Sequence, residues 1–121
     1  IIFHNSNDKS KIKLLKKRGA ILIKQSTDKY KNLDLKKILK DLYKMEIRNL
    51  LVEGGDILTK NFLQNKLFNE FYMFRSSKNL SKNKKHVNFT SFSILNTKYN
   101  KHKINSKLAT DKLTIYKNWN V

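Results

Sequence analysis

The sequence predicts an α/β fold whose sheet is mostly parallel, with antiparallel strands at its end and helices on both faces. Short apolar runs alternate with segments of helical periodicity over residues 1–74, in the order β-α-β-α-β-α-β. Strands that alternate with helices of this length imply right-handed crossovers, which place parallel strands in one sheet. After residue 98 polar and apolar residues alternate, which is typical of antiparallel strands.

The first part of the chain predicts a strand, a helix and a second strand. Residues 1–3 are apolar and form the first expected strand. Ser6 or Asp8 can cap the following helix, and Gly19 stands where a left-handed residue ends a helix. Residues 20–23 are continuously apolar, so we expect a second strand that is buried on both faces.

A second helix, a third strand and a third helix follow. The second helix opens at Asp34 and carries an apolar stripe at three- and four-residue spacing, which we interpret as core: Leu35, Ile38, Leu39, Leu42 and Tyr43. Residues 50–53 predict the third strand, and a third helix runs to about Lys66. Residues 67–74 are rich in aromatic side chains and predict the fourth strand.

The remainder of the chain has a different character. Residues 75–88 are polar and basic, which indicates a long exposed loop. Residues 89–95 fit either a strand or an irregular packed segment. Residues 98–104 and 112–116 predict two antiparallel strands, with a turn over residues 107–111.

Composition argues against three classes of protein: nucleic-acid-binding modules, metalloproteins and proteins with membrane-spanning helices. The net charge of +18 invites a nucleic-acid interpretation, but the cations are nearly all lysines, spread along the chain, and no known nucleic-acid module is present. The chain has no cysteine, and its three histidines lack metal-ligand spacing, so we expect no metal site. No apolar run approaches the ~20 residues of a membrane span.

The segment over residues 49–56, Asn-Leu-Leu-Val-Glu-Gly-Gly-Asp, is the best candidate for a site. It contains two of the three glycines in the chain, Gly54 and Gly55, between an apolar run and a helix. This order aims free backbone N–H groups and the positive end of a helix dipole at an anion such as a phosphate. The alternative is a tight turn without a ligand. Glu53 follows the expected strand, where α/β sheets bind ligands, although it could cap its own helix. His4 also ends a strand and is a candidate ligand contact.

These residues resemble the C-terminal reductase domain of the bifunctional riboflavin-biosynthesis deaminase/reductase. The resemblance lies in Leu-Leu-Val-Glu-Gly-Gly at residues 50–55, Ile-Leu at residues 57–58, and Leu-Phe-Asn-Glu-Phe at residues 67–71. Residues 108–116 are similar to the closing strand of that family. The similarity covers nearly the whole chain and is most specific in its central third.

The resemblance implies a dihydrofolate-reductase-like fold and an NADPH-dependent reduction of 5-amino-6-(5-phosphoribosylamino)uracil to its ribityl form. It places Glu53 against the substrate. The residues that it places along NADPH are Gly54, Gly55, Asp56, Ile57, Leu58, Thr59 and Asn61, with His4 near the position of a cofactor-contacting threonine. It names no catalytic residue in this chain.

The same resemblance sets expectations for organisation. Residues 1–121 correspond to the C-terminal portion of a single reductase domain, and the first strands of that domain would precede Ile1. The family implies a cytoplasmic homodimer, with a deaminase domain upstream in its bifunctional form. Two alternatives stay open: a related reductase acting on a pterin, or a lysine-rich module that binds nucleic acid.

Overall fold

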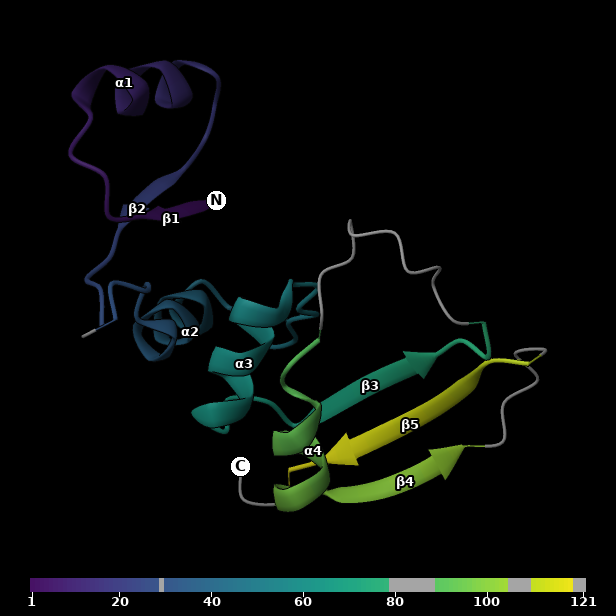
Figure 1. Ribbon diagram of the computed structural model, residues 1–121. Coiled ribbons are helices and arrows are strands. Elements are labelled where there is room, and N and C mark those ends of the chain that lie inside the picture. Colours follow the sequence, from purple (N-terminus) through teal and green to yellow (C-terminus); the bar gives the residue numbers. More distant parts are fainter. Residues whose placement is uncertain (29, 79–88, 105–109, 119–121) are drawn as a thin grey trace. The chain divides into compact units, whose positions relative to one another are not determined.

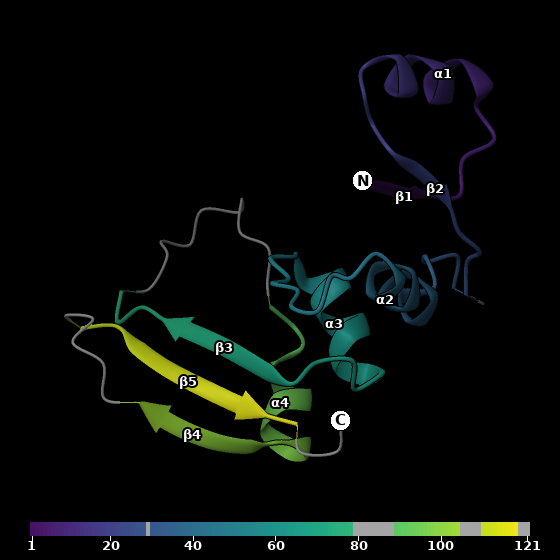
Figure 2. The same cartoon turned by 180° about the vertical axis from the view of Figure 1, so that it is seen from behind.

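The computed structural model describes residues 1–28, 30–78, 89–104 and 110–118. The chain consists of two units, Ile1–Leu51 and Val52–Val121. Figure 1 labels their helices and strands, and Figure 2 shows them from behind. The described residues form a mixed α/β fold with one parallel and one antiparallel sheet.

The first unit begins with the predicted strand, helix and strand. Strand β1 (Ile2–His4) pairs in parallel with β2 (Leu22–Lys24), and α1 (Lys9–Lys17) makes the connection between them. The Asp8 side chain caps α1 by accepting the Lys11 N–H at 3.0 Å. Both the cap and the parallel pairing confirm the prediction for this part of the chain.

The expected burial of the second strand on both faces is wrong. Leu22 and Ile23 are only half-buried, and Ile21 is 59% exposed. The sheet of this unit has two strands, so neither strand has a neighbour on each side. A continuously apolar run predicts full burial only when further strands and helices surround it.

Helix α2 (Leu35–Lys44) completes the first unit and begins as predicted. The Asp34 carboxylate accepts the backbone N–H groups of Lys36 and Lys37. The apolar stripe is half-buried except at Tyr43, which is 62% exposed and lies under the Arg48 guanidinium. None of the stripe residues is fully buried, so the stripe does not form the closed core that we expected.

The described part of the second unit contains two helices and a three-stranded sheet. Helix α3 (Asp56–Gln64) precedes β3 (Glu70–Arg75), and α4 (Phe92–Lys98) precedes β4 (Asn100–Ile104) and β5 (Lys112–Lys117). The strand order is β3-β5-β4, and both pairings are antiparallel. The predicted antiparallel strands at the end of the chain are thereby confirmed. Helices α3 and α4 stand together at the end of the sheet where β3 begins and β5 ends (Figure 1, Figure 2).

A small aromatic core holds this unit together. Leu63 of α3, Leu95 of α4 and Tyr116 of β5 are almost completely buried. The half-buried side chains packed against them are Phe68, Phe71, Met73, Ile94 and Tyr99. Burying one such side chain stabilises a fold by roughly 1.5–3 kcal/mol, so these contacts dominate the packing of the two helices on the sheet.

Asn118, directly after β5, forms hydrogen bonds with the segment between α3 and β3. Its side-chain amide donates to the carbonyl oxygens of Lys66 at 3.1 Å and Phe68 at 3.0 Å. Its backbone N–H donates to the Asn69 carbonyl at 2.9 Å. Asn118 is buried, so these bonds satisfy backbone groups that water does not reach easily.

Three helices end in the same backbone motif. After α1, α2 and α3 a residue with positive φ closes the last turn: Gly19 (φ 82°), Glu46 (φ 65°) and Lys66 (φ 55°). At Lys66 the backbone N–H donates to the Leu63 carbonyl, and the next N–H, of Leu67, donates to the Phe62 carbonyl. This pair of bonds defines a Schellman motif, in which glycine is the favoured residue.

The predicted third strand is absent. Residues 50–53 belong to neither sheet, and Leu51 is 81% exposed. A strand requires a neighbouring ladder, and the described strands pair only as β1 with β2 and as β3-β5-β4. Among the described residues, parallel pairing is therefore confined to β1 and β2, and the strands form two sheets and not one mostly parallel sheet.

The segment over residues 89–95 is also corrected. It is not a strand: residues 89–91 precede the helix without regular secondary structure, and residues 92–95 form the first turn of α4. The predicted loop over residues 75–88 and the turn over residues 107–111 fall partly outside the described residues. Within the described part of the chain, no helix has the length and hydropathy to cross a membrane.

Candidate functional site

The N-terminus of α3 differs from those of α1 and α2. Asp8 and Asp34 cap the first two helices with carboxylates, whereas Gly55 caps α3 and has no side chain. In the described part of the chain, no side chain accepts a hydrogen bond from the first N–H groups of α3. These groups and the positive end of the helix dipole can therefore receive an anion.

The two glycines before α3 have different roles. Neither has a positive φ, so neither is required for an unusual backbone conformation. A Cβ on Gly54 would lie 2.7 Å from Cδ2 and 3.1 Å from Cβ of Leu58. A Cβ on Gly55 would have no atom within 4 Å. Gly54 thus permits the chain to pack on its own helix, and Gly55 leaves open space beside the free N–H groups.

Thr59 and Asn61 lie further along α3. The Thr59 hydroxyl donates to the Gly54 carbonyl at 3.4 Å, and its N–H donates to the Gly55 carbonyl at 3.1 Å. Both bonds hold the glycine turn against the helix. Asn61 accepts from the Asn65 side chain at its own side-chain oxygen, 2.6 Å, and at its carbonyl, 2.9 Å. Its polar group is thus directed to the C-terminal end of α3.

Asp56, the first residue of α3, is directed at α4. Its Oδ1 accepts the N–H groups of Thr90 and Ser91 at 2.9 and 3.2 Å and the Ser91 hydroxyl at 3.0 Å. Its Oδ2 accepts the Thr90 hydroxyl at 2.5 Å. The Thr90 hydroxyl, followed by the Ser91 donors, holds the pKa of Asp56 below its ordinary value. The carboxylate charge is therefore engaged by four donors from the start of α4.

Sequence reasoning missed Thr90 and Ser91. They lie 34 and 35 positions after Asp56, so no local spacing connects them. The available signal was indirect: a Thr-Ser pair before a helix provides donors and hydroxyls, and an acid at the first position of another helix provides acceptors.

Glu53 and the apolar residues of the site are open to solvent. Glu53 is exposed and makes no hydrogen bond or ion pair with any described residue. Ile57 is 78% exposed, and Leu58 is partly exposed beside Gly54. Residues 53–61 are thus gathered on one turn and one helix.

His4 belongs to the first unit, at the end of β1, where its Nδ1 accepts the Ser6 N–H at 3.2 Å.

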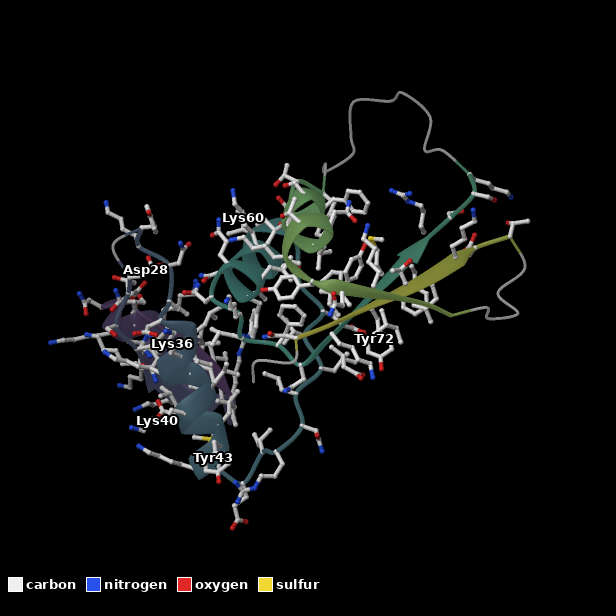
Figure 3. The ribbon with its side chains drawn as sticks, turned by 90° about the horizontal axis from the view of Figure 1, so that it is seen from below. Asp28, Lys36, Lys40, Tyr43, Lys60 and Tyr72 are labelled. Carbon is white, nitrogen blue, oxygen red and sulfur yellow. The ribbon has the colours of Figure 1, made fainter. Side chains whose placement is uncertain are left out.

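Other candidate chemistry is sparse in the described residues. Across their four ranges, no three His, Asp or Glu side chains gather as a metal site would require. His86 lies outside the described residues. The lysines are spread over several elements of both units, and Figure 3 labels Lys36 and Lys40 on α2 of the first unit and Lys60 on α3 of the second.

The comparisons with known proteins identify the family. A search of the curated proteins gave no match. The family model described as the RibD C-terminal domain matches residues 1–107, which include the glycine turn and both helices that meet at Asp56. The chain therefore belongs to the RibD C-terminal domain family, the reductase domain of the riboflavin pathway.

Proposed function

We propose that this domain uses NADPH to reduce the ribosyl group of 5-amino-6-(5-phosphoribosylamino)uracil to a ribityl chain. The observation that carries the proposal is the N-terminus of α3, where a glycine cap, N–H groups without a side-chain acceptor among the described residues, and open space at Gly55 coincide. Family membership makes a phosphorylated cofactor and a phosphorylated substrate the relevant anions.

In this proposal the first turn of α3 holds the phosphates of NADPH. The N–H groups of Asp56, Ile57 and Leu58 are the donors, and the helix dipole adds a favourable field. The exposed side chain of Ile57 offers an apolar surface beside these donors. Thr59 supports the turn through its bond to the Gly54 carbonyl. When bound, NADPH supplies a hydride to the anomeric carbon of the ribosyl group.

Glu53 is the proposed substrate contact. It is exposed, it precedes the glycine turn directly, and no described residue neutralises its charge. A free carboxylate can accept hydrogen bonds from sugar hydroxyls, which orients the sugar for the hydride. We propose His4 and Asn61 as cofactor contacts because of the family resemblance alone. Their described hydrogen bonds are made with Ser6 and Asn65 and do not indicate a ligand.

Three wider expectations belong to the same proposal. We also propose an upstream deaminase domain, which the family match supports, together with a homodimer and a cytoplasmic location. Light scattering of the natural-length protein tests the dimer, and a deamination assay on the same sample tests the upstream activity. A monomer would contradict the homodimer, and lack of deamination would contradict the upstream deaminase domain.

The experiment that tests the proposal is an NADPH titration of the natural-length protein, followed by nucleotide fluorescence, for wild type and Gly55→Val. Gly55 has an ordinary φ of −70° and free space for a side chain, so the variant should fold normally. The side chain would occupy the space that a phosphate needs, and we expect NADPH affinity to fall by at least about tenfold, or 1.4 kcal/mol.

Gly19→Ala is the matched control. It substitutes the glycine with positive φ at the end of α1, so it should lower thermal stability without changing NADPH affinity. Product analysis with the pyrimidine substrate and with a pterin then identifies the reaction. The proposal would be refuted if folded wild-type protein bound no NADPH, or if the Gly55→Val variant bound NADPH with the affinity of wild type.

A further inference from the structure

The two residues that lead into α4 are held by a residue of another helix. Ser91 is the N-cap residue of α4, and its side chain makes no capping bond with the helix that it begins. The acceptor is supplied by Asp56, which takes both N–H groups and both hydroxyls of Thr90 and Ser91. A local cap fixes one helix end, whereas this carboxylate fixes the starts of two helices together.

The same contact determines where the charge of Asp56 lies. A carboxylate in the first turn of a helix interacts favourably with the dipole, and it would oppose a second anion at that end. Both of its oxygens face donors from Thr90 and Ser91, so the side chain is held toward α4. The backbone N–H groups beside Gly55 are then left without a side-chain acceptor among the described residues.

The two helices are also joined through the core. Leu63 of α3 and Leu95 of α4 pack in one buried cluster. The cluster fixes the later turns of both helices, and the carboxylate fixes their first turns. A displacement of the start of α4 must therefore be transmitted to the first turn of α3.

We propose that Asp56 is a positioning residue that couples the anion-binding first turn of α3 to the start of α4. The part of this inference that concerns NADPH rests on the proposed function, whereas the coupling between the helices does not. Coupling between two sites is reciprocal. An anion that orders the turn of α3 must protect the Thr90 and Ser91 amides, and loss of the Asp56 contact must weaken anion binding.

The test compares three variants of the natural-length protein. Asp56→Ala removes every bond to α4. Asp56→Asn keeps an oxygen for the three donors at Oδ1, and its NH₂ group can donate to the Thr90 hydroxyl oxygen. Thr90→Val removes one bond and alters no residue of α3. Thr97→Val is the control, because its hydroxyl donates to Ser93 within α4.

Amide hydrogen exchange measures the coupling without a ligand. The Thr59 N–H makes the first intrahelical bond of α3, to the Gly55 carbonyl, and reports on the order of this turn. We expect faster exchange of Thr59 in Asp56→Ala and in Thr90→Val, recovery in Asp56→Asn, and no change in Thr97→Val. Unchanged Thr59 exchange in folded Thr90→Val would overturn the coupling, even if Asp56→Ala does not fold.

NADPH titration measures the consequence for binding. We expect NADPH to slow exchange of Thr90 and Ser91 in wild type, and Asp56→Ala to bind NADPH about tenfold more weakly, within the usual range of coupling between sites. Asp56→Asn should restore most of this affinity. Tighter binding by Asp56→Ala would show that Asp56 acts as a repelling charge and would overturn its positioning role. Wild type that binds no NADPH would refute the proposed function, and the exchange of Thr59 would still decide the coupling.

Discussion

The substitution Lys66→Gly should stabilise the protein. Lys66 closes the Schellman motif of α3 with a φ of 55°, a conformation that costs an L-residue about 1–2 kcal/mol. Its side chain is exposed, and the bonds of the motif use backbone atoms that glycine also has. The carbonyl that receives the Asn118 amide is likewise unchanged.

The magnitude follows from two opposing terms. Relief of the left-handed conformation contributes about 1–2 kcal/mol, and the greater backbone entropy of an unfolded glycine removes about 0.5–1 kcal/mol. The expected net gain lies between about 0 and 1.5 kcal/mol, and its midpoint corresponds to an increase in Tm of roughly 2–5 °C. Urea unfolding followed by circular dichroism should show a higher midpoint with an unchanged m-value.

Two variants make this test specific. Lys66→Ala removes the same side chain and keeps the Cβ, so it should not gain the stability of Lys66→Gly. Gly19→Ala introduces a Cβ into the equivalent motif of α1, at a φ of 82°, and should destabilise the protein. A Lys66→Gly variant no more stable than Lys66→Ala would refute the assignment of strain to this position.

Two further outcomes are expected from the second unit. Asn118→Ala should lower the free energy of unfolding by about 1–3 kcal/mol, because the carbonyl oxygens of Lys66 and Phe68 lose their part-buried hydrogen-bond donor. A Tm equal to that of wild type within error would contradict this prediction. Glu70 accepts the Tyr72 hydroxyl at 2.6 Å and pairs with Lys117 at 3.1 Å, and these contacts, the Tyr72 bond first, lower its pKa. A lowered folded-state pKa gives stability that is present above the unfolded pKa and is lost as pH falls through the folded value, so Tm should decline below about pH 4.5, the ordinary pKa of Glu. Glu70→Gln should flatten that part of the profile of Tm against pH. An equal decline of Tm in both proteins would rule out a role for this carboxyl.

Local signals in the sequence were sufficient for most helices and for the family. Asp8 and Asp34 begin helices where their type and position predict, and Gly19 ends the first one. The pairing of β4 with β5 agrees with the prediction of two alternating strands joined by a turn. Each of these features depends on interactions between residues that are close in the chain, which sequence patterns record directly.

Features that depend on distant residues were not predictable. Residues 50–53 have the composition of a strand, yet no described strand pairs with them. Residues 92–95 have the composition of a strand, yet they begin α4, and Asp56 accepts the N–H groups of the two residues before it, Thr90 and Ser91. For the candidate site, the glycine turn was located from sequence, whereas the engagement of Asp56 by Thr90 and Ser91 required the structure.

The Asn118 contact also bears on how the chain acquires its structure during synthesis. The amide of Asn118 meets the Lys66 carbonyl across 52 positions, and β5 is the central strand of its sheet. Contacts of such sequence separation form slowly and only after both partners have left the ribosome. Until β5 emerges, β3 has no described partner strand, and Phe71 and Met73 lack the strand and core side chain that cover them. A nascent chain stalled before residue 112 would therefore expose the aromatic strand β3, which makes this part of translation the period of greatest need for a chaperone.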